Sequence, residues 1–168
     1  MTPLSNLSCL LELHLLACEK ITDFTPLSGL PFLQTLNCSH SGMADLEPLS
    51  CIYSVVNLYL QYCIDITDLT PLSSLSSLQT LDCYHCEGIA DLTPLSNLSR
   101  LLYLDCGSCP RLKDLTPLSG LSSLQTLKCF NSSGYYNSTP LSDFDLTPLS
   151  NLTSLKIITA DQLHMPIF

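Results

Sequence analysis

Cysteine is the residue type in this chain whose spacing first suggests chemistry. Cys83-x-x-Cys86 and Cys106-x-x-Cys109 are two CxxC pairs with 19 residues between them, a separation found in zinc ribbons. Four thiolates that converge in a tetrahedron bind one zinc ion, and cysteine thiolates can also carry out redox chemistry. The first hypothesis is therefore a metal-binding or redox protein that uses its cysteines.

Aspartate forms a second regular series along the chain. Its members are Asp23, Asp45, Asp68, Asp91, Asp114 and Asp145. A rail of carboxylates could hold hard cations. Each aspartate, however, lies two residues before a Thr or Glu that precedes Pro, where its oxygen can accept a backbone N–H bond at the start of a helical turn. Because calcium loops need several ligand types from one loop, we expect a structural role for the series.

Other arrangements that could support catalysis do not stand out from the sequence. The histidines, His14, His40, His85 and His164, show no Ser-His-Asp or Cys-His spacing, and we expect His40 and His85 to be solvated turn residues. The six glycines are scattered singly, so there is no glycine-rich phosphate loop. The sequence therefore predicts no catalysis and no cofactor.

An internal repeat explains most of these series. The tripeptide Pro-Leu-Ser recurs in steps of 22 or 23 residues, followed by one final step of 8. Its copies begin at Pro3, Pro26, Pro48, Pro71, Pro94, Pro117, Pro140 and Pro148. The cleanest repeat, residues 70–92, reads TPLSSLSSLQTLDCYHCEGIADL. Repeats of this length are typical of a solenoid, in which each unit buries its apolar face against its neighbours.

Each repeat predicts one short strand, a turn and one helical turn. Apolar and polar side chains alternate in the strand, so Leu81 and Cys83 point to one face and Asp82 and Tyr84 to the other. The Thr-Pro pair of the template predicts a helix start, with Thr as N-cap and Pro at the first helical position. The segment that follows has room for only one turn of α or 3-10 helix.

Stacking of the strands predicts three buried columns. The first holds Leu10, Leu33, Val55, Leu78, Leu101, Leu124 and Leu155; the second holds Leu13, Leu36, Leu58, Leu81, Leu104, Leu127 and Ile158; the third holds Leu15, Cys38, Leu60, Cys83, Cys106, Cys129 and Ala160. Because cysteine shares the third column with Leu and Ala, it acts there as a small apolar residue. Stacked strands lie about 4.8 Å apart, so neighbouring cysteines should point the same way and not converge on a metal. This favours a structural cysteine ladder, with the metal or redox interpretation as the alternative.

The repeat resembles the leucine-rich-repeat family, whose strand segment is LxxLxLxxC. The run I-x-D-L-T-P-L-S resembles the short bacterial repeats of the internalin type, and HCxGIxDLTPLSxL, as in residues 85–98, is similar to repeats of certain trypanosomatid leucine-rich-repeat proteins. The resemblance implies an α/β repeat solenoid, a right-handed curved array with a parallel β-sheet on the concave face and short helical or 3-10 turns on the convex face. It also implies protein recognition on the concave face.

The domain organisation predicted from the repeat is a single array over residues 1–168. The predicted repeats are 2–24, 25–46, 47–69, 70–92, 93–115, 116–146 and an incomplete 147–168. The second is one residue shorter, where Ser41 replaces the usual cysteine, and predicts a second turn geometry. The sixth carries an eight-residue insertion within residues 133–146, which we expect to bulge as a loop from the turn or convex side. Without a polar capping repeat at either end, the array could self-associate end to end or be a fragment of a longer array.

Charge and hydropathy exclude several classes of partner and location. Only 12% of residues are charged and the net charge is −9, which argues against binding to nucleic-acid phosphates. No apolar run approaches the roughly 18 residues of a membrane helix, and the N-terminus has no signal-peptide pattern. Ten cysteines then fit a compartment that keeps thiols reduced. We expect an intracellular, cytoplasmic protein without membrane insertion, with truncation of the N-terminus left open.

The outward face of the sheet is the predicted binding surface, because its residues vary between repeats while the buried columns do not. The predicted partner-binding residues on this concave face are Tyr59, Tyr62, Asp82, Tyr84, Tyr103, Asp105, Lys128 and Phe130. Aromatic residues contribute much of the binding energy of protein interfaces, although Tyr and Phe are also common in strands that bind no partner. We expect the five rings to form one aromatic area beside the two carboxylates, and the net negative charge favours a basic partner.

The sequence thus predicts a non-catalytic protein–protein interaction module. A self-associating structural array is the alternative, and a metal or redox protein is the second alternative.

Overall fold

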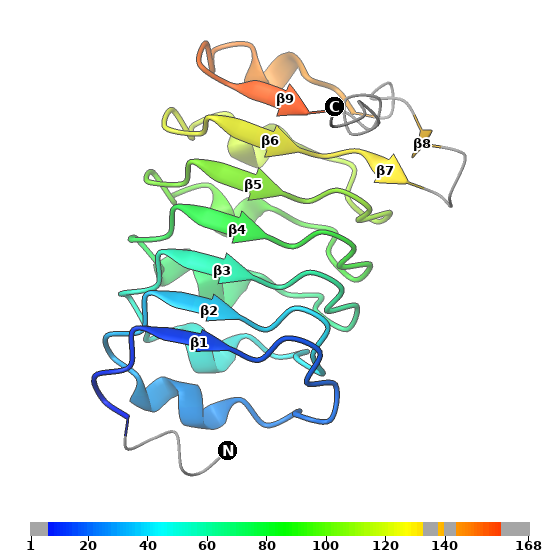
Figure 1. Ribbon diagram of the computed structural model, residues 1–168. Coiled ribbons are helices and arrows are strands. Elements are labelled where there is room, and N and C mark those ends of the chain that lie inside the picture. Colours follow the sequence, from blue (N-terminus) through cyan, green and yellow to red (C-terminus); the bar gives the residue numbers. More distant parts are fainter. Residues whose placement is uncertain (1–6, 133–137, 140–143, 159–168) are drawn as a thin grey trace, which may run out of the picture.

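Among the described residues, seven parallel strands form one open sheet whose strand order follows the chain (Figure 1). This computed structural model describes residues 7–132, 138–139 and 144–158. The strands are β1 (Glu12–His14), β2 (Thr35–Asn37), β3 (Asn57–Tyr59), β4 (Thr80–Asp82), β5 (Tyr103–Asp105), β6 (Thr126–Lys128) and β9 (Lys156–Ile158). The predicted α/β repeat solenoid with one strand in each repeat is confirmed.

Each strand is short, and β2 to β6 bury their middle residue. In β2 to β6 this residue is a leucine with no exposed surface, and the register pairs each leucine with the next. These leucines are Leu36, Leu58, Leu81, Leu104 and Leu127. Successive repeats have nearly equal lengths, so parallel pairing stacks equal positions above one another. The second predicted column is therefore confirmed over these strands.

Short 3-10 helices lie behind the sheet (Figure 1). They are η2 (Thr25–Gly29), η3 (Glu47–Leu49), η4 (Thr70–Ser74), η5 (Thr93–Leu95), η6 (Thr116–Leu118) and η8 (Thr147–Leu149). Each has Pro in its first turn and buries one leucine. Over the described ranges, none of the helices has the length and apolar content that a bilayer span requires.

The prediction that Thr is the N-cap of these helices is wrong. In η4 the N-cap is Leu69, whose side chain makes no capping hydrogen bond, and Thr70 is the first helical residue. The capping hydrogen bond comes instead from the residue before Leu69, because Asp68 Oδ1 accepts the N–H of Thr70 at 2.8 Å. The other five aspartates of the series accept the same bond at 2.8–3.0 Å. The structural role expected for the aspartate series is confirmed.

Acid should weaken the fold through this aspartate series. Hydrogen bonds from the hydroxyl and N–H of the following Thr lower the pKa of Asp23, Asp68, Asp91, Asp114 and Asp145 below the usual 3.8. Because the folded-state pKa is the lower one, the stabilisation is complete above the unfolded-state pKa and is lost as pH falls through the folded-state pKa. Urea unfolding should therefore show a loss of stability below about pH 4. Changing Asp68, Asp91 and Asp114 to Asn keeps the acceptor oxygen and should reduce this loss; an unchanged acid dependence would contradict the assignment.

Cysteines of two columns complete the core. Cys38, Cys83, Cys106 and Cys129 of the third predicted column are buried beneath the sheet, which confirms their apolar role. A second series in the turns is also buried and consists of Cys63, Cys86 and Cys109. Its thiols donate to carbonyl oxygens of the preceding repeat at 3.0–3.4 Å. Each of these oxygens also accepts a backbone N–H within its own turn, so the thiol is a second donor that links neighbouring turns.

Two turn geometries coexist in the array, as predicted from the shorter second repeat. In that repeat Ser41 Oγ accepts the N–H of Met43 at 3.3 Å. In the next two repeats the carbonyl oxygen of the turn cysteine accepts the N–H of Ile66 or Ile89 at 3.2 Å. A hydroxyl acceptor thus replaces a backbone acceptor where the turn is one residue shorter.

The C-terminal part of the array departs from the simple repeat. Register pairs Leu127 with Ile157, so the prediction that Ile158 continues the second column is wrong. Among the described strands β9 has only β6 beside it and comes after the insertion, and it departs from the register of the regular repeats. β7 (Asn131–Ser132), directly before the insertion, and β8 (Ser138–Thr139), inside it, pair antiparallel outside the main sheet. The rest of the insertion (133–137 and 140–143) and the C-terminal segment 159–168 lie outside the described residues.

Candidate binding surface

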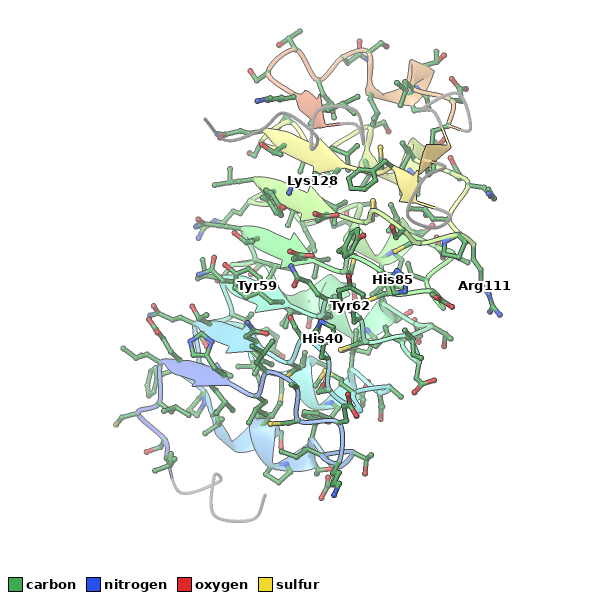
Figure 2. The ribbon with its side chains drawn as sticks, turned by 45° about the vertical axis from the view of Figure 1, so that its right-hand side comes forward. His40, Tyr59, Tyr62, His85, Arg111 and Lys128 are labelled. Atoms are coloured by element: carbon green, nitrogen blue, oxygen red, sulfur yellow. The ribbon has the colours of Figure 1, made fainter. Side chains whose placement is uncertain are left out.

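The register of the strands brings four of the predicted site residues into one row. Tyr59, Asp82, Asp105 and Lys128 occupy the last position of β3 to β6, and each pairs with the next. Neighbouring strands lie about 4.8 Å apart, so these side chains follow one another across the exposed face of the sheet. Figure 2 labels the two ends of this charged row, Tyr59 and Lys128.

Asp105 is the most fully bonded member of the charged row. It is only 5% exposed, and it accepts the N–H of Gly107 at 3.0 Å and the hydroxyl of Tyr103 at 3.3 Å. Lys128 Nζ lies 3.5 Å from its Oδ2 and also 5.4 Å from the centroid of the Tyr103 ring. Burial raises the pKa of Asp105 and the charge of Asp82 adds to this, against the effects of Gly107 and Lys128. The lysine thus balances one buried carboxylate and makes a cation–π contact.

Asp82 lies beside Asp105 but has different partners. It is 6% exposed; Gln61 Nε2 donates to its Oδ2 at 2.5 Å, and the N–H of Tyr84 donates to its Oδ1 at 3.1 Å. In the part of the chain that the structure describes, no lysine or arginine nitrogen lies within 4.0 Å of this carboxylate. The row therefore holds two buried carboxylates against one ammonium group.

Aromatic contacts follow the ends of the strands, with Tyr62 at their centre. Its ring stacks on His40 at a centroid distance of 4.1 Å, and lies 4.8 Å from the ring of His85 and 5.5 Å from that of Tyr84. Tyr84 continues the contacts to His85 at 6.0 Å and to Phe130 at 6.2 Å. We call these five residues the ring ladder, and Figure 2 shows its members His40, Tyr62 and His85 next to one another.

The five aromatic residues predicted as one area fall into two groups. Tyr62, Tyr84 and Phe130 belong to the ring ladder, whereas Tyr59 and Tyr103 lie with the charged row. Tyr62 is 38% exposed, but Phe130 is only 6% exposed. Tyr59, Tyr84 and Tyr103 are half-buried. Tyr62 is therefore the predicted ring most open to a partner, and Phe130 supports the surface from below.

His40 and His85 are members of the ring ladder that sequence reasoning missed. They and Tyr62 have φ values of 54–59°, a left-handed conformation that residues other than Gly adopt infrequently. The N–H of each donates to a carbonyl oxygen of the next repeat at 2.8–2.9 Å, so the same conformation recurs and the rings stack. The available signal was their shared position, directly before Ser41, Cys63 or Cys86 in the repeat.

The buried cysteines have the chemistry of core residues. Among the described residues, no group of three or more His, Cys, Asp or Glu side chains is arranged to hold a metal ion. Burial raises the pKa of the Cys38, Cys86 and Cys106 thiols, and that of Cys129 to about 11. Metal binding and redox reactions both need the thiolate form. These features weigh against a metal or redox role for the buried cysteines.

Thiol labelling should separate the ten cysteines into distinct classes. Cys9 and Cys51 are exposed, Cys18 is half-buried, and the other seven are buried. With a maleimide under native conditions we expect rapid labelling of Cys9 and Cys51, and labelling of the buried seven only after denaturant is added. Mass spectrometry of the digested protein identifies the labelled sites. Prompt modification of Cys83 or Cys109 in the folded protein would contradict the buried ladder.

Comparisons with known proteins agree with this architecture. The family description "Leucine Rich repeats (2 copies)" matches residues 53–97. Internalin C2 from Listeria monocytogenes is 31% identical over 92% of this chain and 73% of that chain, with a TM-score of 0.71. The leucine-rich-repeat ectodomain of the Arabidopsis thaliana membrane receptor kinase GASSHO1/SCHENGEN3, solved in complex with CASPARIAN STRIP INTEGRITY FACTOR 2, is 18% identical over 82% of this chain and 16% of that chain, with a TM-score of 0.58, and shares the fold alone. Comparison with curated proteins gives no match.

The similarity to internalin C2 extends over most of both chains, and the family description matches the middle of the array. Both agree with the array of repeats, each with one strand of a parallel sheet, seen here. The resemblance drawn from the T-P-L-S turn is thereby confirmed. The chain belongs to the leucine-rich-repeat family and is an array of internalin-like repeats.

Proposed function

We propose that this chain is a non-catalytic module that binds a protein partner on the exposed face of its sheet. Leucine-rich-repeat proteins generally mediate protein–protein interactions, which supports the class of function. The observation that carries the proposal is the contrast between two adjacent strand positions. From β2 to β6 the core position is always Leu, whereas the position beside it, on the opposite face of the sheet, changes through Asn37, Tyr59, Asp82, Asp105 and Lys128. A scaffold alone needs the first pattern but does not need the second position to change from repeat to repeat.

The chemistry of the face also supports a protein partner. Tyr59, Tyr62 and Tyr84 offer rings of the type that dominates interface energies. They lie on or directly after strands of one continuous sheet, which holds them in place before a partner arrives. The net charge of −9 favours a basic partner surface and an association that weakens with salt. The ten free cysteines fit a reducing compartment, so we place the encounter inside the cell.

The test is a comparison of three immobilised proteins in one cell extract: the wild type, a face variant and a matched control. The face variant carries Tyr59→Ala and Tyr84→Ala. The control carries Phe32→Ala and Tyr53→Ala, two residues that are each 58% exposed and lie in the segments before β2 and β3. Phe130 stays intact, because it is buried and its truncation would disturb the core. A partner is a protein that the wild type and the control retain and that the face variant loses at least about tenfold.

Capture of the same proteins by the wild type and by the face variant would contradict the proposed face, provided that circular dichroism shows both to be folded. Size-exclusion chromatography over a range of concentrations tests the self-association alternative. Concentration-dependent assembly that the face variant does not change would favour that alternative over a separate partner.

A further inference from the structure

We infer that the ring ladder receives an extended, basic segment of the partner protein, with its arginine or lysine side chains over the rings. This inference rests on the proposed function and adds the chemistry of the partner. Its first support is the distribution of charge along the chain. No Lys or Arg occurs between Lys20 and Arg100, yet this stretch holds eight of the fifteen acids. They are Asp23, Asp45, Glu47, Asp65, Asp68, Asp82, Glu87 and Asp91.

The ring ladder lies mostly within this stretch that lacks Lys and Arg. Four of its five members, all except Phe130, fall between residues 21 and 99. At the neighbouring Tyr103 the chain supplies its own cation, since Lys128 Nζ lies 5.4 Å from the ring centroid. A cation over Tyr or Phe within about 6 Å of the centroid is attracted by the negative face of the ring. His40, which is exposed at one end of the ladder, and Tyr62, which is 38% exposed, offer ring surface to a cation from outside.

Two carboxylates lie beside the ring ladder, and their negative charge adds to the attraction of a cation. Glu87 Oε1 lies 3.2 Å from His85 Nε2, and the Glu87 side chain is 55% exposed. Asp82 accepts the backbone N–H of Tyr84 and, unlike Asp105, has no lysine or arginine within 4.0 Å among the described residues. A guanidinium group can stack on a ring and bond to a carboxylate at the same time. Arginine therefore fits this border better than an apolar or acidic side chain.

The length of the ring ladder sets the length of the segment. It extends from His40, directly after β2, to Phe130, directly after β6. Four steps between strands of about 4.8 Å span roughly 19 Å, which an extended chain covers with about six residues. The occupant is thus a stretch of about six residues with several basic side chains.

The experiment titrates the full chain with capped hexapeptides and follows its amide signals by NMR. The probe alternates arginine with glycine, and the comparison peptide replaces each arginine by citrulline, which has the same planar shape without the charge. We expect shifts concentrated at the amides of Tyr62, Tyr84 and His85. The arginine peptide should bind at least about tenfold more tightly than the citrulline peptide, and its affinity should fall as salt is added.

Two pairs of variants locate the site. Tyr62→Asn removes the ring, and because asparagine tolerates positive φ, the turn conformation is kept. We expect the affinity of this variant for the arginine peptide to fall at least about fivefold. The matched control, Tyr53→Asn, makes the same change at a tyrosine outside the ladder and should bind as the wild type does. Asp82→Asn with Glu87→Gln removes charge without removing volume and should reduce the affinity and its salt dependence.

Three results of the peptide titrations would each overturn the inference: equal affinity for the citrulline peptide, wild-type affinity in Tyr62→Asn, or shifts spread evenly over the exposed capping aspartates. Calcium chloride is titrated in parallel, and shifts at Asp82 and Glu87 with calcium but not with the arginine peptide would also overturn it. Failure here is distinguishable from failure of the proposed function. If the face variant loses partner capture while the arginine peptide does not bind, the partner uses the face but does not present a basic segment.

Discussion

Replacing Gly88 by Ala is expected to lower the free energy of unfolding by about 3 kcal/mol. A Cβ atom at Gly88 would overlap the backbone carbonyl oxygen of Ile66 and would lie 2.9 Å from Thr67 Cγ2. The oxygen belongs to the turn of the preceding repeat, so the overlap can be relieved only if two packed turns move apart. Gly88 does not have a positive φ, so the expected cost is steric and does not come from a left-handed backbone.

Gly120 provides the matched control for this prediction. No atom outside its own neighbourhood lies within 4 Å of the Cβ position at Gly120. Gly120→Ala should therefore leave the free energy of unfolding unchanged or raise it by about 0.5 kcal/mol, because Ala reduces the entropy of the unfolded chain. Urea unfolding followed by circular dichroism measures both variants. Equal stability of the two would show that the turns of neighbouring repeats do not approach each other as closely as the structure indicates.

The repeat period explains why the fold could be predicted from the sequence. Once Leu36, Leu58 and Leu81 recur at nearly constant spacing, a parallel register that pairs them leaves few alternatives, because a shift by one residue would expose all of them. The close approach at Gly88 could not be predicted in the same way. The equivalent position holds Asp65 and Arg111 in the adjacent repeats, so nothing in the template indicates that glycine is required there.

The helix caps show where a repeated pattern remains ambiguous. Aspartate and threonine are both favoured N-cap residues, and the D-x-T-P template contains both. Sequence reasoning assigned the cap to Thr and a supporting role to Asp. In the structure the Asp side chain makes the bond and Thr begins the 3-10 helix. Only the backbone geometry of the turn distinguishes these arrangements.

The candidate site was predictable as a face but not as a set of contacts. The alternation of side chains along a strand places Asp82, Asp105 and Lys128 on one side of the sheet. It says nothing about His40 and His85, which follow the strands and point where they do because φ is positive. Ring contacts between repeats therefore depend on a turn conformation that side-chain alternation does not predict. This is why the aromatic area expected from Tyr59 to Phe130 is divided in the structure.

Replacing Lys128 by Met is expected to lower the free energy of unfolding by about 2 kcal/mol at neutral pH. The change keeps most of the side-chain volume but leaves Asp105, whose side chain is 7% exposed, without the ammonium group 3.5 Å away. Loss of one partner of a fully buried ion pair typically costs about 3–5 kcal/mol. The smaller value applies because the Lys128 side chain keeps 23% of its surface exposed, so solvent already screens part of the interaction.

The pH dependence of the Lys128→Met variant identifies the cause of this loss. Burial raises the pKa of Asp105 in the folded protein, and removal of Lys128 should raise it further. A raised folded-state pKa means that the folded protein favours the protonated carboxyl, so stability is present below the unfolded-state pKa and is lost as pH rises through the folded-state pKa. The difference in the free energy of unfolding between variant and wild type should therefore be small below about pH 4 and grow toward neutral pH.

In the double variant Lys128→Met with Asp105→Asn, the amide oxygen can still accept the N–H of Gly107 without carrying a charge, so much of the neutral-pH stability should return. If the double variant is as unstable as Lys128→Met and shows the same pH dependence, the buried charge of Asp105 is not the source of the loss.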